Sequence, residues 1–223
     1  MYATRTTSES PGRRYRLSDR ILMEMDQALR TVFCNPVDAG SPHPDDGIPE
    51  TELGPAGRRE SARLMRVNHA GEISAQALYQ SQSWFGRDAQ IREALRQSAR
   101  DEHQHLAWCG RRLEDLGAGP SLLAPLVYSG SLGIGALAGV FGDRWSLGFV
   151  AETENQVIRH IDNHLDRLPP EDLRSRAILD RMKYDEAHHG ETARRAGGRE
   201  LPAPVRWLMR RLSKLMTTST YHL

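Results

Sequence analysis

The chain has 223 residues, enough to bury a sizeable core, and this length suits one domain with short appendages. Its 30 basic and 29 acidic side chains leave a net charge of +1, which gives no electrostatic reason to expect a nucleic acid partner. The two cysteines, Cys34 and Cys109, form no Cys-x-x-Cys motif. They argue against a disulfide scaffold, a zinc ribbon and a rubredoxin-type iron site.

The first 58 residues are predicted to extend the main domain. Residues 1–16 are polar and lack the apolar core of a secretory signal, which favours a cytoplasmic location. Residues 17–33 have apolar side chains at helical spacing and predict an amphipathic helix that Ser18 could cap. Residues 35–58 are rich in proline, glycine and aspartate and predict an ordered loop or linker.

Residues 59–223 are predicted to form the main domain, and their pattern is helical. Helical segments run over residues 59–116 with a break near Gly86, 145–168 and 171–196, and glycine or proline residues end them. Residues 121–142 carry no charge, and residues 204–216 are amphipathic and basic. Because no segment alternates like a strand, the predicted fold class is all-α, with about six helices.

Two copies of Asp-Glu-x-x-His distinguish this domain. One occupies residues 101–105 and the other residues 185–189. Each follows an earlier glutamate, since Glu72 lies 30 residues before Glu102 and Glu154 lies 32 residues before Glu186. About thirty residues form a helical hairpin at a rise of roughly 1.5 Å per residue, so each half can bring its two glutamates to one level.

These spacings predict a metal centre, because residues three apart on a helix share a face. A Glu from each of two helices and Glu-x-x-His from two others is the ligand set of ferritin-like di-iron and di-manganese proteins. Four carboxylates facing one another in a dry core are costly, but two divalent ions neutralise them, and carboxylate with imidazole suits iron or manganese. The candidate ligands are Glu72, Glu102, His105, Glu154, Glu186 and His189.

Neighbouring residues leave alternatives open. Asp101 and Asp185 could each accept the distal imidazole N–H of the opposite motif. His103 and His188 lie off the ligand face, and His160 lies six residues beyond Glu154. Asp185 and His188 also form Asp-x-x-His, which would require a rotated helix. The plainer interpretation of each single motif is an exposed helical acid with an incidental histidine.

Longer strings resemble one known family. They are "LMRVNHAGEISAQALYQSQ" (64–82), "DEHQHLAWCGRRLEDLGAGPSLLAPL" (101–126), "GFVAETENQVIRHIDNHL" (148–165) and "MKYDEAHHGETA" (182–193). Together they resemble the demethoxyubiquinone hydroxylase family, over about residues 60–197. The family's ligands map onto the same six residues. Glu152 is a nearby competitor, and the likeness through "QVIRHIDNHL" favours Glu154.

The resemblance implies a ferritin-like four-helix bundle with two iron ions that uses O₂ to hydroxylate the ring of a polyprenylated demethoxy-benzoquinol in ubiquinone biosynthesis. A ferroxidase or iron-storage protein uses the same ligands, and a manganese catalase is compatible with them. A helical scaffold with a vestigial site is the non-enzymatic alternative. The sequence leaves open whether electrons come from NADH or from the quinol.

A substrate of this kind lies in a bilayer, which suggests membrane contact. Residues 121–142 could span the membrane, form an apolar hairpin that enters lipid or lines a quinone channel, or simply be core. In residues 204–216, Trp207, Leu208, Leu212, Leu215 and Met216 could face lipid, with Arg206, Arg210, Arg211 and Lys214 toward headgroups. We therefore expect a peripheral or monotopic protein on the cytoplasmic face of the cell membrane, with other ubiquinone-biosynthesis proteins as further candidate partners.

Overall fold

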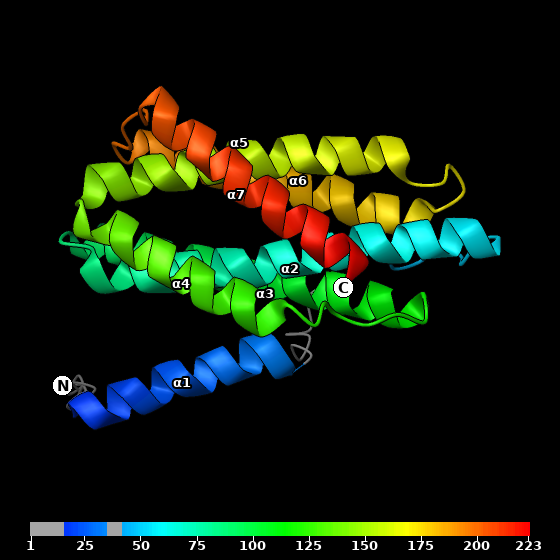
Figure 1. Cartoon of the computed structure of the whole chain (residues 1–223), viewed down its shortest axis with the longest axis horizontal. Helices are drawn as coiled ribbons and strands as arrows, with labels where there is room; N and C mark the ends of the chain where they lie inside the picture. The colour runs from blue at the N-terminus through cyan, green and yellow to red at the C-terminus, as the bar shows by residue number, and fades with distance from the viewer. Residues whose placement is uncertain (1–15, 35–41) are drawn as a thin grey trace, which may run out of the picture.

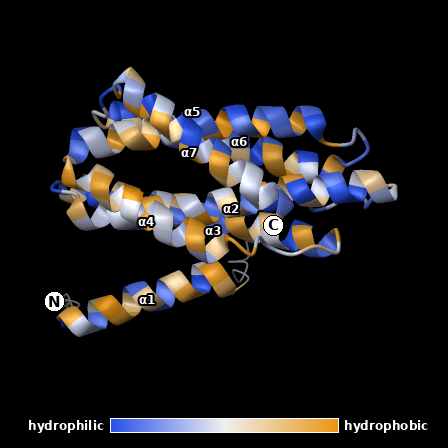
Figure 2. Cartoon of the chain, in the orientation of Figure 1, coloured by the Kyte–Doolittle hydropathy of each residue, from blue (hydrophilic) through white to orange (hydrophobic). Residues whose placement is uncertain are grey.

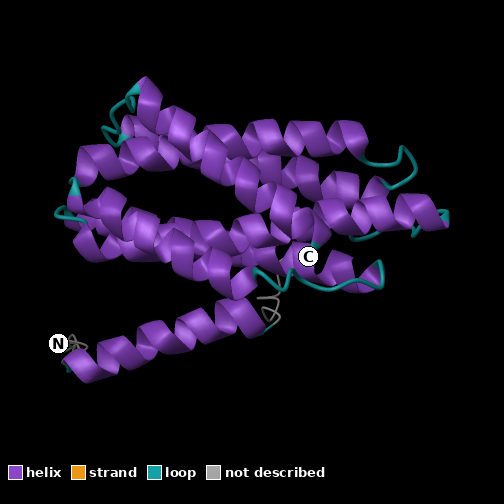
Figure 3. Cartoon of the chain, in the orientation of Figure 1, coloured by secondary structure: helices purple, strands orange, loops and turns teal. Residues whose placement is uncertain are grey.

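A computed structural model describes residues 16–34 and 42–223, and within them it contains seven helices and no strand (Figure 3). The all-α class is confirmed, with one helix more than the six or so expected. The helices are α1 (Leu17–Phe33), α2 (Pro55–Phe85), α3 (Ala89–Asp115), α4 (Ala124–Val140), α5 (Asp143–Arg167), α6 (Leu173–Arg195) and α7 (Ala203–His222). The predictions for residues 1–15 and 35–41 lie outside the described residues.

Two antiparallel hairpins form a four-helix bundle. α2 pairs with α3, and α5 pairs with α6 (Figure 1). α4 packs along α2, α7 crosses obliquely over the bundle, and α1 lies beside α2 and α4 (Figure 1). Long helices in the two hairpins let residues from all four meet in one central section.

Local chemistry fixes the turns of both hairpins. Asp88 caps α3, where its carboxylate accepts hydrogen bonds from the backbone N–H groups of Gln90 and Ile91. The Asp143 carboxylate accepts the N–H groups of Arg87 and Asp88, each at 2.9 Å, which joins the α2–α3 turn to the start of α5. This contact sets the position of one hairpin against the other.

The uncharged stretch 121–142 forms one helix, α4, and therefore no hairpin. It approaches α2 closely, since a Cβ on Gly135 would lie 2.6 Å from the Leu78 carbonyl oxygen. Its other face leaves Leu126 and Leu137 exposed. Among the helices of the described ranges, none combines the length and apolar character needed to cross a bilayer. The spanning interpretation is therefore wrong for this helix.

The N-terminal region differs from the sequence prediction in two details. α1 begins at Leu17, so Ser18 lies in its first turn and is not its cap; the Asp19 carboxylate instead accepts the Arg16 backbone N–H at 2.8 Å. α2 begins at Pro55, inside the predicted linker, because proline is tolerated at the first helical position.

The described part of that linker is an ordered loop held by buried charge. Arg112 is fully buried and donates to Glu50, to Asp172 and to the Ser175 hydroxyl. Arg174 donates to Asp45 and Glu50 from the start of α6. These ion pairs close the end of the bundle where α3 finishes and α6 begins.

Candidate metal centre

The structure brings all six candidate ligands together in the interior of the bundle. α2 supplies Glu72, α5 supplies Glu154, and α3 and α6 each supply one Glu-x-x-His. Their ligand atoms form two groups, within each of which every atom lies within 4.8 Å of the others. The groups are Glu72, Glu102, His105 and Glu186, and Glu102, Glu154, Glu186 and His189. Glu102 and Glu186 belong to both groups.

Each imidazole is held between a carboxylate pair inside the site and an aspartate outside it. Nδ1 of His105 lies 2.9 Å from Glu102 and 3.2 Å from Glu186, while its Nε2 lies 3.3 Å from Asp185. The aspartate belongs to the opposite motif, so α3 and α6 are linked across the bundle.

The second motif repeats the arrangement. Nδ1 of His189 lies 3.2 Å from Glu102, and its Nε2 lies 3.5 Å from Asp101. Asp101 in turn accepts a hydrogen bond from Gln97, and Asp185 accepts one from Arg181, each at 2.8 Å. The two aspartates therefore fix which nitrogen of each ring faces the carboxylates, the usual role of an outer carboxylate beside a metal-binding histidine.

Burial and neighbouring charges shift the pKa of several groups in the centre. Burial, followed by the charges of neighbouring glutamates, raises the pKa of Glu72 and of Glu154 well above their ordinary value. Burial alone would lower the pKa of His105, but Asp185 and Glu102 outweigh it and raise that pKa. Burial would raise the pKa of Glu102. The hydrogen bonds and charges of His105 and His189 outweigh burial and lower that pKa to about 2.

The donor atoms fit bound metal. One oxygen of each glutamate is buried and accepts no well-aligned hydrogen bond among the described residues: Glu72 Oε2, Glu102 Oε1, Glu154 Oε1 and Glu186 Oε2. Nδ1 of His189 lies 3.2 Å from Glu102 but likewise makes no well-aligned hydrogen bond among these residues. Buried polar atoms are normally paired, so this concentration of incompletely paired acceptors at one point fits a site that could hold metal ions.

The nearby alternatives are placed elsewhere. Glu152 accepts a hydrogen bond from Gln156 and lies 3.6 Å from Arg159, so it belongs to neither ligand group. His188 is exposed, and His103 is partly buried with its pKa lowered by that burial. His160 contacts His164 edge to face, at 3.9 Å between ring centroids.

Several buried polar residues near the centre were not considered from the sequence. Asn68 donates to the Leu64 carbonyl and lies 3.0 Å from Nδ1 of His164. Tyr79 is almost fully buried, and Trp108 lies 5.1 Å from the His105 ring. Helical spacing could have found two of them, because Asn68 and Tyr79 lie four residues before and seven residues after Glu72 on the same face.

Fold and site define a class of protein: the ferritin-like carboxylate proteins, in which four helices surround paired glutamates and two Glu-x-x-His motifs. Comparison with known proteins narrows this class. A family model described as ubiquinone biosynthesis protein COQ7 matches residues 59–220.

Named relatives agree with the family model. A 3-demethoxyubiquinol 3-hydroxylase from Chromobacterium violaceum is 53% identical over 203 residues, which cover 91% of this chain and 98% of the relative. The 3-demethoxyubiquinol 3-hydroxylase of Nitrosococcus oceani is 52% identical over 210 residues, covering 94% and 98%. The chain belongs to the COQ7 family of ubiquinone biosynthesis proteins. The resemblance drawn from the sequence is confirmed.

Proposed function

We propose that this chain is a di-iron monooxygenase that uses O₂ to hydroxylate the ring of a polyprenylated demethoxy-benzoquinol in ubiquinone biosynthesis. The observation that carries the proposal is the buried set of four glutamates and two histidines, within a chain whose relatives are named 3-demethoxyubiquinol 3-hydroxylase. Iron ions held there would supply the electrons and the oxygen activation that no side chain provides.

The protein's own residues bind, orient and exclude water. Glu72, Glu102, Glu154 and Glu186 with His105 and His189 would hold two iron ions, whose charge as Fe²⁺ balances the four carboxylates. Asp101 and Asp185 would fix the orientation of the two imidazoles. The surrounding helices keep the carboxylates out of water, which strengthens their hold on a cation.

Replacement of a shared ligand tests the proposal. Glu186→Ala removes a carboxylate that belongs to both ligand groups, so we expect bound iron to fall below two ions per chain and hydroxylation to be lost. Glu191→Ala is the matched control, because that exposed glutamate on the same helix bonds only to Arg194 and Arg195 in the described structure. Full iron content and turnover in Glu186→Ala would refute the ligand set.

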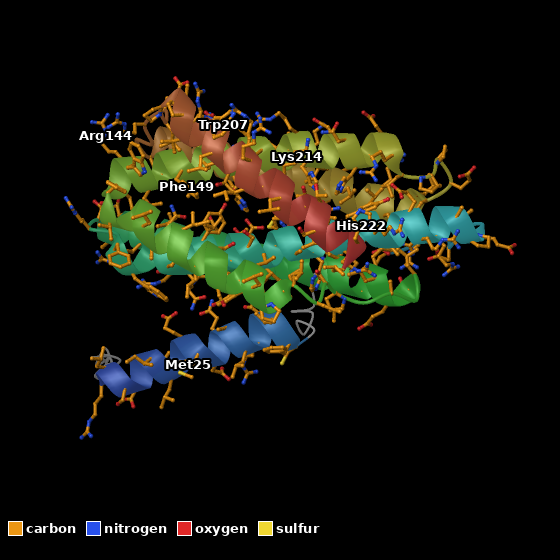
Figure 4. The ribbon with its side chains drawn as sticks, viewed as in Figure 1. Met25, Arg144, Phe149, Trp207, Lys214 and His222 are labelled. Atoms are coloured by element: carbon orange, nitrogen blue, oxygen red, sulfur yellow. The ribbon has the colours of Figure 1, made fainter. Side chains whose placement is uncertain are left out.

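We also propose that the protein binds the cytoplasmic face of the cell membrane as a peripheral protein, where its substrate resides. Apolar residues follow α1 and α4 (Figure 2), and Trp207 and Lys214 both lie on α7 (Figure 4). The exposed apolar side chains of α7 are Trp207, Leu208, Leu212 and Leu215. Such a helix binds anionic lipid through apolar insertion and basic charge.

Flotation with anionic vesicles tests this location. Leu215→Asp should reduce flotation of the intact protein, because Leu215 is 66% exposed on the apolar side of α7. Tyr184→Asp is the control, since Tyr184 on α6 is 71% exposed and lies outside the apolar stripe of α7. Equal flotation of wild type and Leu215→Asp would refute lipid contact through α7.

A further inference from the structure

The bundle is packed unevenly on the two sides of the metal centre. Three or four residues from each ligand glutamate toward one end, the four helices place larger side chains in or against the core: Asn68, Leu106, Val157 and Met182. Toward the other end, the nearest residues on three of the helices are alanines three positions from a ligand glutamate: Ala75, Ala99 and Ala151. The fourth helix has Gly190 four residues after Glu186.

This layer of small residues is closed on its far side by larger ones. Tyr79, Leu95 and Leu147 lie seven residues from Glu72, Glu102 and Glu154, and they pack in one cluster with Ala75 and Ala151. We call Ala75, Ala99, Ala151 and Gly190 the alanine layer. It separates the metal centre from Tyr79 by about seven residues, roughly 10 Å at 1.5 Å per residue.

Tyr79 carries an unexplained hydroxyl. Its side chain is 1% exposed within the cluster that contains the alanine layer, and its phenol oxygen has no hydrogen-bond partner in residues 16–34 and 42–223. Burial of a hydroxyl without a partner is costly, and tyrosine normally finds one. Phenylalanine would fill the same volume without that cost, so the hydroxyl points to a ligand.

We propose that the quinol ring binds in the alanine layer and that the Tyr79 hydroxyl donates a hydrogen bond to a ring oxygen. This placement rests on the proposed function and names the ring site for it. Because these side chains are small, a flat ring placed in this layer would have one edge toward the ligands and the other toward Tyr79. Tyr79 is a positioning residue, since it sets which ring carbon faces the metal centre.

An apolar seam leads from this layer to the surface and suits the polyprenyl tail. Leu78 directly precedes Tyr79 in the chain, and Phe149 directly precedes Val150. Leu78 and Phe149 pack with Ala138 of α4 and with Leu201. Phe149 lies on the part of α5 that faces α4 (Figure 4). Beyond Ala138, Leu137 and Val140 are exposed on α4. A tail that follows this seam emerges at the apolar face of α4.

Paired tyrosine variants test the ring site. The probe is a demethoxy-benzoquinone with one prenyl unit, titrated into aerobic iron-loaded protein without reductant so that binding is measured apart from turnover. Tyr79→Phe should weaken probe binding and raise the KM for the quinol by about three- to tenfold, the range for one hydrogen bond. Its iron content and melting temperature should not fall, because the hydroxyl has no partner to lose in the described part of the chain.

Tyr128→Phe is the matched control. The Tyr128 hydroxyl, which is also buried, donates to Gln80 at 2.5 Å between α4 and α2. This variant should lose stability and keep its affinity for the probe. Ala151→Leu should fill the layer and abolish probe binding with two iron ions still bound. If that variant does not fold, the Tyr79→Phe result decides.

The outcomes separate the ring site from the proposed function. Wild-type protein that converts the quinol, together with a Tyr79→Phe variant of unchanged affinity and KM, would overturn the ring site alone. Wild-type protein that binds iron but leaves the quinol unchanged would overturn the proposed function and the ring site with it. Weakened binding in Tyr79→Phe and unchanged binding in Tyr128→Phe support the placement.

Discussion

Replacement of Glu154 by glutamine should have opposite effects on stability with and without metal. Burial first, and the charge of Glu186 next, raise the pKa of Glu154 in the metal-free protein. A carboxyl whose folded-state pKa is raised holds its proton longer in the native state than in the unfolded chain. Its contribution to stability is therefore present below about pH 4.5 and is lost as pH rises through the folded-state pKa.

The size of the effect follows from what the substitution removes. Glutamine cannot ionise, so at pH 7 the metal-free variant avoids the penalty of a buried, incompletely paired carboxyl group, about 1–3 kcal/mol. The wild type gains about 2.7 kcal/mol from metal at a hundred times its dissociation constant, and a variant that has lost a ligand gains less. Glu154→Gln should thus be the more stable protein in chelator and the less stable one in anaerobic Fe²⁺.

Urea unfolding at pH 7 in both conditions measures this reversal. Glu152→Gln is the control on the same helix, because Glu152 bonds to Gln156 and lies outside the ligand groups. It should keep the full stabilisation by iron. A Glu154→Gln variant that is stabilised by iron as strongly as wild type would refute the assignment of Glu154 as a ligand.

Three further substitutions test the fold around the site. Arg112→Met leaves the buried Asp172 carboxylate without its guanidinium partner and should lower the free energy of unfolding in urea by about 3–5 kcal/mol. A decrease of less than about 1 kcal/mol would contradict the buried ion-pair network. Burial lowers the pKa of His69 to about 4, so the folded protein loses stability as pH falls below 6.5. His69→Gln should therefore lose about 2 kcal/mol less unfolding free energy than wild type between pH 7 and pH 5. A variant as sensitive to acid as wild type would refute this. Gly135→Ala places a Cβ against the Leu78 backbone and should lower stability by about 1–3 kcal/mol, which a melting curve equal to wild type would contradict.

Much of the bundle could be predicted because its determinants are local. Helical periodicity and the glycines and prolines between segments placed the hairpins to within a few residues. The spacing of Glu72 to Glu102 and of Glu154 to Glu186 selected the residues that the structure brings within ligand distance of one another. The repeat of Asp-Glu-x-x-His also pointed to the contacts of Asp101 and Asp185 with the opposite histidines.

Features that depend on contacts between distant residues could not be predicted in this way. Nothing in the sequence distinguishes Arg112 from a surface arginine, because only folding brings Glu50 and Asp172 into contact with it. Gly135 is one of several glycines in an uncharged stretch, and its close approach to Leu78 depends on how α4 lies on α2. Tyr79 gave no signal beyond its spacing, because an unpaired hydroxyl is visible only once its surroundings are known.

Oxygen labelling of a single turnover tests the central claim most directly. The purified protein is loaded anaerobically with two Fe²⁺ per chain, mixed with a short-tail demethoxy-quinol and exposed to ¹⁸O₂, and the product is weighed by mass spectrometry. We predict a ring-hydroxylated product that carries one ¹⁸O atom. Oxidation of the iron with an unchanged quinone would contradict the account and favour a ferroxidase built on the same six ligands.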